Sequence, residues 1–155
     1  MSKPTFARIG VVSEGTLRDE DLISAFAGEL DYYMKHLRLT RDQRKRFTDL
    51  IREVNDWEDD DNPIDNMGGE VVNELQDALN EIAPPYSYFG MIDGDGACFG
   101  FWPAYEDGDL HKLTAGDPIP RWAWGDDVLL VNDHGNVACG HVDRRGRFKA
   151  YWEAV

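Results

Sequence analysis

Hydrophobic residues in the first part of the chain recur at spacings of three and four, the period of one face of a helix. Between residues 17 and 38 the apolar positions with this spacing are Leu22, Ile23, Phe26, Leu30, Tyr33, Met34 and Leu37. Thr16 is the expected N-cap, because the acidic residues 19–21 follow it at the positive end of the helix dipole. The pattern predicts a helix over about 17–38.

A second helix is predicted directly after the first. Thr40 and Gln43 have the spacing of a capping box, in which each side chain binds a free backbone amide at the start of a helix. An apolar stripe follows them and predicts a helix over about 41–55. The stretch 57–66 is rich in Asp and contains Pro63, so it is predicted to be a linking loop.

A third helical stripe precedes a change of period. It runs from 71 to 82, and the pair Pro84 and Pro85 must end its helix. The segments 86–92 and 97–102 are rich in aromatic and β-favouring residues, and Asp-Gly-Asp-Gly at 93–96 separates them. Glycine allows the positive φ of a tight turn, so these segments are predicted to form a β-hairpin.

Three further strands are predicted at about 128–132, 137–142 and 148–154, with polar turns between them. In the last strand the alternation places Phe148, Ala150 and Trp152 on the core face, and Lys149, Tyr151 and Glu153 in water.

Helices first and strands afterwards predict an α+β fold, in which three N-terminal helices pack on a C-terminal antiparallel β-meander. A length of 155 residues suits a single domain over 1–155, with a helical part at about 16–83 and a β part at about 86–155. The expected core residues are Leu22, Phe26, Leu30, Phe47, Leu50, Ile51, Leu75, Leu79, Phe101, Leu129, Val131 and Trp152.

Composition excludes wholesale disorder and a membrane span. The chain is 42% hydrophobic and 12% aromatic, which is enough to build a core, and no apolar run approaches the length of roughly 20 residues that a bilayer requires. The first fifteen residues lack the pattern of a signal peptide, so we expect a cytoplasmic protein. Cys98 and Cys139 are too few for a disulfide scaffold and are expected to be reduced, structural thiols.

Charge is segregated along the chain, whose formal net charge is −14. The 59 residues of 53–111 contain sixteen Asp or Glu and no Lys or Arg. Seven bases lie just upstream in 35–52, and a second basic group lies at Arg144, Arg145, Arg147 and Lys149. An acidic surface maintains solubility, and opposite blocks of charge can pair within the fold. The overall sign also favours basic partners, since a nucleic acid duplex or an anionic membrane would be repelled.

The candidate metal sites are weak. The acidic residues around 56–65 miss the spacing of an EF-hand loop, and the Asp93 and Asp95 pair fits a hairpin turn better than a magnesium site. The four histidines show no convergent spacing. Cys139 is two residues from His141, but that spacing alone does not position a thiolate and a base for nucleophilic catalysis. No metal or cofactor is expected.

Nine aromatic residues within 86–124 exceed what one face of a small sheet usually needs. They fill a helix–sheet interface, or some of them form a cage for a cationic ligand or the anchors of a protein interface.

Two function classes remain open. The first is a non-enzymatic acidic interaction protein, which imitates the phosphate array of a nucleic acid and occupies a basic groove on a nucleic-acid-binding protein. The expected partner-binding residues are Asp56, Glu58, Asp59, Asp60, Asp61, Asp65, Glu70, Glu74, Asp77 and Glu81. The second is a small ligand-binding or metal-assisted enzymatic domain with a site at the hairpin tips, formed by Asp93, Asp95 and His134.

Several short segments resemble known small proteins. The segment 131–137, the terminal Tyr151-Trp152-Glu153, and Tyr88-Phe89-Gly90 with Gly100-Phe101-Trp102-Pro103 are similar to small orphan proteins of phage and other mobile elements. The size and the aromatic hairpin also resemble compact inhibitors of restriction and CRISPR systems. The resemblance covers the C-terminal half and implies no catalytic residues; the acidic helix is not part of it.

Overall fold

A computed structural model describes residues 3–59, 65–106 and 108–154, with the side chains of 57–67 left outside the description. The chain forms two compact units. The first comprises Met1–Ala83 and Tyr88–Trp102, and the second comprises Pro84–Ser87 and Pro103–Val155. The predicted hairpin therefore belongs with the helices, and each unit contains its own sheet.

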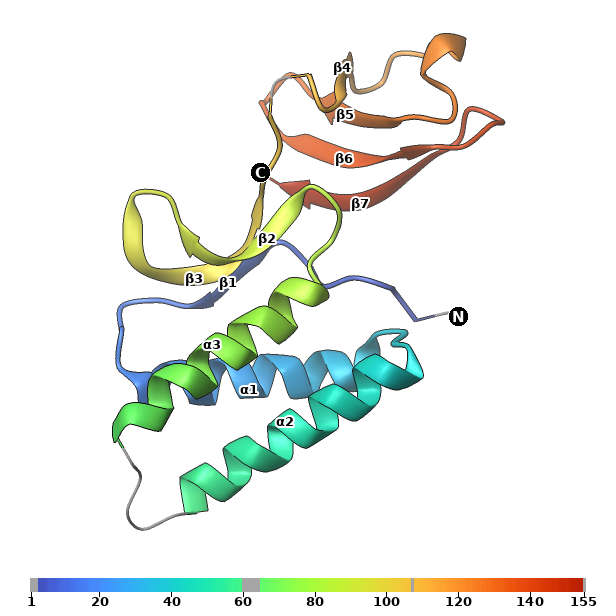
Figure 1. Ribbon diagram of the computed structural model, residues 1–155. Helices are drawn as coiled ribbons and strands as arrows, with labels where there is room; N and C mark the ends of the chain where they lie inside the picture. The colour runs from blue at the N-terminus through green and yellow to red at the C-terminus, as the bar shows by residue number, and fades with distance from the viewer. Residues whose placement is uncertain (1–2, 60–64, 107, 155) are drawn as a thin grey trace. The chain divides into compact units, whose positions relative to one another are not determined.

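Three helices and a three-stranded sheet make up the first unit. The helices are α1 (Asp19–His36), α2 (Arg41–Asp59) and α3 (Asp65–Glu81), and the strands are β1 (Gly10–Ser13), β2 (Ser87–Ile92) and β3 (Asp95–Pro103). The strand order is β1-β3-β2, and β1 runs antiparallel to β3. Helices α1 and α3 lie between α2 and this sheet (Figure 1). The predicted hairpin turn is confirmed at Gly94, where φ is +88°.

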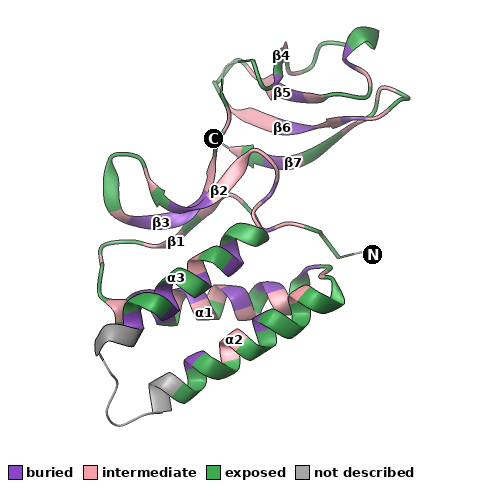
Figure 2. Ribbon diagram, in the orientation of Figure 1, coloured by how far each residue is buried: buried purple, intermediate pink, exposed green. Residues whose placement is uncertain are grey.

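The core of the first unit is aromatic. Phe26 of α1 is fully buried, and its ring packs edge-on against Phe89 at 5.0 Å and Phe99 at 5.3 Å. Buried side chains line α1 and α3, whereas most of α2 is exposed (Figure 2). Of the twelve core residues predicted for the whole chain, nine are buried and three are half-buried: Leu50, Ile51 and Val131.

The helix boundaries confirm one cap and correct another. Thr40 and Gln43 form the predicted capping box, with N···O distances of 3.0 and 3.1 Å. Thr16 is not the N-cap of α1, because the cap position is Arg18. The Thr16 hydroxyl instead accepts a hydrogen bond from the Arg18 amide and donates one to Asp21, which fixes a turn ahead of the helix.

The predicted loop over 57–66 is also wrong at both ends, since α2 continues to Asp59 and α3 begins at Asp65. Acidic residues do not prevent a helix, and an Asp is favoured at a helix start by the dipole. The one strong helix breaker in this stretch is Pro63, which lies between the two helices in sequence.

A four-stranded sheet forms the second unit, in the order β4-β5-β6-β7. Its strands are β4 (His111–Thr114), β5 (Asp127–Val131), β6 (Val137–Val142) and β7 (Phe148–Ala154), with a 3-10 turn at Arg121–Ala123. Strands β5, β6 and β7 form the predicted antiparallel ladder. Strand β4 pairs parallel with β5, so the sheet is mixed and the expectation of a purely antiparallel meander is wrong. The fold class remains α+β.

A β-bulge in β7 changes which side chains share a face. Cys139 pairs with Trp152 and Gly140 pairs with Ala150, so Tyr151 is the extra residue. Cys139 and His141 are two apart and face the same side, and their partners Trp152 and Lys149 therefore also share that side although they are three apart. The strict alternation predicted for this strand is wrong at the bulge.

Candidate functional site

The described part of the predicted acidic surface is exposed. Glu70, Glu74, Asp77 and Glu81 all lie on the solvent side of α3, as predicted, and Glu53 of α2 is exposed too. We call these five residues the acidic face. Asp56 is exposed but belongs to α2 rather than to a loop. The remaining predicted partner-binding residues lie outside the described side chains: Glu58, Asp59, Asp60, Asp61 and Asp65.

Glu81 is neutralised inside the molecule. The Arg46 guanidinium donates to both of its carboxylate oxygens, at 2.8 and 2.6 Å. The hydrogen bonds from Arg46, followed by one from Gln43, hold the pKa of Glu81 below its ordinary value against the opposing effect of burial. Glu81 is therefore the member of the acidic face least available to a partner.

The other carboxylates of α3 lack such compensation. Within the described residues no Lys or Arg lies at ion-pair distance from Glu70, Glu74 or Asp77. Partial burial raises the pKa of Glu74, and so do the neighbouring charge of Glu53 and a hydrogen bond with it. Glu74 therefore has acidic rather than basic neighbours at this point of the surface.

A groove of about 320 Å³ separates α2 from α3 beside these carboxylates. Its apolar lining comes from the half-buried Leu50 and from the buried Phe47 and Ala78. Its polar lining consists of the carboxylates of Glu74, Asp77 and Glu81 and of the Arg46 guanidinium, which pairs with Glu81. Such a combination suits a lysine or arginine side chain, whose stem is apolar and whose head is charged.

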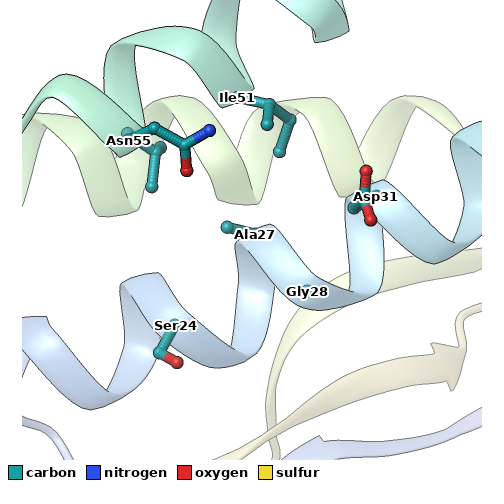
Figure 3. A pocket seen from close by; sticks show the side chains of 7 residues that line it. Ser24, Ala27, Gly28, Asp31, Ile51 and Asn55 are labelled. Carbon is teal, nitrogen blue, oxygen red and sulfur yellow. The ribbon is translucent and has the colours of Figure 1, made fainter. Parts of the chain in front are cut away.

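A second groove of about 300 Å³ lies between α1 and α2 (Figure 3). Ala27 and Gly28 leave space on α1, and Ile51 and Asn55 face it from α2. Asp31 lies at one end of this groove and accepts a hydrogen bond from Lys35 at 3.0 Å, so its charge is already paired.

The hydrogen bonds described for Asp95 and His134 at the hairpin tips lie within their own turns. Asp95 accepts a hydrogen bond from the amide of Ala97, and the backbone amide of His134 donates to Asn132. Asp93 and Asp95 belong to the first unit and His134 to the second. Among the described residues, no group of three or more His, Cys, Asp or Glu is placed to hold a metal ion.

The thiol of Cys139 is unsuited to nucleophilic chemistry. Its side chain is fully buried, and burial, followed by the nearby charge of Asp127, raises its pKa to about 12. The reactive form of cysteine is the thiolate, which is scarce near neutral pH at such a value. Both cysteines are free and buried, as the expectation of reduced structural thiols requires.

A different group of residues converges in the second unit around Asp127. Its Oδ2 accepts a hydrogen bond from the Tyr86 hydroxyl at 2.6 Å. Its Oδ1 accepts one from the Tyr151 hydroxyl at 2.9 Å and lies 2.8 Å from Nδ1 of His141. We call these four residues the Asp127 cluster.

The electrostatics of the Asp127 cluster favour an ionised carboxylate. Burial raises the pKa of Asp127, but the hydrogen bonds from Tyr86, His141 and Tyr151 outweigh it and hold the pKa below its ordinary value. The hydrogen bond to Asp127 strongly raises the pKa of Tyr86, and burial together with the same carboxylate raises that of Tyr151 to about 12. Both phenols therefore remain protonated donors near neutral pH.

The two tyrosines of the Asp127 cluster both lie at irregular points of the backbone. Tyr86 has a φ of +60°, and among the described residues it is the only non-glycine with a positive φ. A bulky residue rarely adopts this left-handed region, and such strain concentrates at functional sites. Tyr151 is the bulged residue of β7, and bulges commonly re-aim side chains beside such sites.

Sequence reasoning missed the Asp127 cluster, although one signal was present. The short turn at 132–136 sets the register of β5 against β6, and this register makes Asp127 the partner of His141. The contributions of Tyr86 and Tyr151 depend on the positive φ and on the bulge, which leave no periodic trace in the sequence.

In comparisons with known proteins, no family model, curated protein or solved structure matches the chain. In the described ranges, no helix combines the length and the apolar character that crossing a membrane requires.

Proposed function

We propose that this protein is an acidic interaction protein that imitates the phosphate array of a nucleic acid and occupies a basic groove on a nucleic-acid-binding partner. The observation that supports this most is the uncompensated charge of Glu70, Glu74 and Asp77, which are exposed along α3 without a basic partner among the described residues. A groove that neutralises phosphates with Lys and Arg also accepts carboxylates fixed in a row.

The groove between α2 and α3 supports a basic partner in a second way. A lysine or arginine from the partner can lay its stem on the half-buried Leu50 and bring its charge to Glu74 and Asp77. Arg46 makes a related arrangement within the chain, since its guanidinium lies 5.6 Å from the centre of the Phe47 ring and pairs with Glu81.

The resemblance to small proteins of phage and mobile elements suggests the class of partner. We propose a host defence or other nucleic-acid-binding complex, which the protein would inhibit by competing with nucleic acid. Binding of this partner then involves no direct contact between the acidic face and nucleic acid.

The test compares two charge-reversed variants. The first carries Glu70→Lys, Glu74→Lys and Asp77→Lys; the second carries Asp93→Lys, Asp117→Lys and Asp133→Lys, which change the net charge equally at exposed positions elsewhere. Immobilised wild-type protein and the control variant should retain the same partner from host lysate at low salt, and duplex DNA should displace it. The first variant should retain none. Equal retention by the first variant, or failure of DNA to displace the partner, would contradict the proposal.

A further inference from the structure

The Asp127 cluster fixes the proton positions of His141. An ionised carboxylate can only accept hydrogen bonds, so Nδ1 of His141 must donate to Oδ1 of Asp127. In the neutral imidazole the lone pair then lies on Nε2. The side chain of His141 is 43% exposed, so the imidazole remains accessible to a ligand.

The rest of the cluster holds this arrangement in place. Tyr86 donates to the other oxygen of Asp127, and Tyr151 donates to the oxygen that His141 contacts. The carboxylate therefore has a fixed position, reached at the cost of a left-handed Tyr86 and a bulge at Tyr151. A carboxylate that orients an imidazole is the arrangement by which many enzymes position a general base.

A lysine is the cross-strand neighbour of His141. Register pairs Asp127 with His141 and His141 with Lys149, so these three side chains form one row on one face of the sheet. The β6–β7 turn, adjacent in the chain, adds the exposed Arg144 and Arg145. These residues belong to the second basic group of the sequence, in which Arg147 pairs with Asp143. The proposed function uses neither Lys149 nor the two turn arginines.

The second unit is also much less acidic than the first. It contains six Lys or Arg against nine Asp or Glu, whereas the chain as a whole has 16 against 30. A small or single-stranded anion at Lys149 therefore meets less repulsion from this unit than a long duplex meets from the chain as a whole.

We propose that His141 is the general base of a site for a phosphodiester with a neighbouring hydroxyl, as in RNA. Nε2 of His141 removes the hydroxyl proton while that oxygen forms a bond to phosphorus and the bond from phosphorus to the leaving oxygen breaks. Lys149 binds the phosphoryl oxygens, and Asp127 is a positioning residue. The leaving oxygen takes a proton from water, and the imidazolium returns its proton to solvent.

The choice of substrate follows from the groups around the base. The buried Cys139 is protonated, so it does not supply the nucleophile. A hydroxyl within the substrate provides one at high effective concentration, so a single base is sufficient. This inference goes beyond the proposed function and concerns residues of the other unit, so the two can fail separately.

The probe is 2-hydroxypropyl 4-nitrophenyl phosphate, which releases 4-nitrophenolate when its hydroxyl attacks phosphorus. The full-length protein should cleave it faster than buffer alone. His141→Ala should lower kcat at least about 100-fold, because general base catalysis typically contributes that much. Lys149→Gln should mainly raise KM. A wild-type rate equal to that of buffer, or full activity in His141→Ala, would overturn the proposal.

A matched control is available in the same unit. Nε2 of His111 lies 3.3 Å from an oxygen of Asp126, but both side chains are exposed and no tyrosine fixes this pair among its described contacts. His111→Ala should leave the rate unchanged. Ethyl 4-nitrophenyl phosphate, which lacks the hydroxyl, should remain intact, and its cleavage at an equal rate would contradict attack by the substrate hydroxyl.

Two measurements separate positioning from folding. Nitrogen-15 NMR of the wild-type protein should show His141 with its proton on Nδ1, and a proton on Nε2 in the neutral ring would overturn the assignment. Asp127→Asn should lower kcat about tenfold or more with little change in KM and should alter this tautomer. If Asp127→Asn does not fold, Tyr86→Phe should lower kcat in the same direction, and an unchanged kcat in that variant would contradict the positioning role.

Discussion

Arg46 donates hydrogen bonds to both carboxylate oxygens of Glu81 and so joins α2 to α3 across 35 residues of sequence. The same guanidinium reaches Asp42 one turn earlier in its own helix, at 2.9 Å. The pair closes one end of the groove whose other carboxylates, Glu74 and Asp77, have no basic partner among the described side chains. The same groove therefore contains Glu81, which is paired with a base, and Glu74 and Asp77, which are not. Their contributions to the free energy of unfolding can be measured separately.

We expect the Glu81 contribution to stability to disappear in acid. Its pKa is held below the ordinary value of 4.5, chiefly by Arg46, so its stabilising effect is present above pH 4.5 and is lost as pH falls through the folded pKa. Glu81→Gln should therefore melt at a slightly lower temperature than wild type at pH 7, by less than roughly 4 °C because the pair is partly exposed. The difference should shrink as the pH is lowered below 4.5. A difference that grows as the pH falls would contradict this assignment.

The contribution of Glu74 to stability has the opposite pH dependence. Burial and the neighbouring carboxylates raise its pKa, so folding is favoured below pH 4.5 and that advantage is lost as pH rises through the folded pKa. Glu74→Gln should therefore melt at a higher temperature than wild type at pH 7 and show no gain below pH 4. Glu153→Gln, an exposed change in the other unit, provides the control and should leave the melting temperature unchanged. A loss of stability in Glu74→Gln at pH 7 would disprove the repulsion.

Two glycine-to-alanine changes should have opposite effects. At Gly140 a Cβ would collide with the Lys149 carbonyl oxygen and with the Phe148 ring, so Gly140→Ala should destabilise the sheet beside the bulge. Gly28 lies within α1, and a methyl group added there would meet nothing within 4 Å, so Gly28→Ala should stabilise the helix by up to about 1 kcal/mol. Urea unfolding of both variants measures these effects, and a stabilised Gly140→Ala would contradict the described register.

The sequence predicts the helices well because each has a long apolar stripe. It does not predict β1 and β4, which are four residues each and too short to establish an alternation. Strands β4 and β5 are consecutive, but parallel pairing needs a crossover connection, and no periodic pattern in residues 115–126 indicates one. The helical pattern of α3 likewise predicts which of its acidic residues are exposed, but it cannot show that Glu81 is paired with Arg46.

The division of the chain has a consequence for its synthesis. Pro84–Ser87 belongs to the second unit although sequence on both sides of it belongs to the first. Within the second unit, Trp152 donates its indole N–H to the Pro85 carbonyl at 2.9 Å, and Tyr86 binds Asp127. A ribosome therefore delivers this short segment long before the strands that use it, and the segment must wait until β7 has been synthesised. A fragment that begins at Pro103 would lack this segment, and its strands would fold without the partners of Trp152 and Asp127.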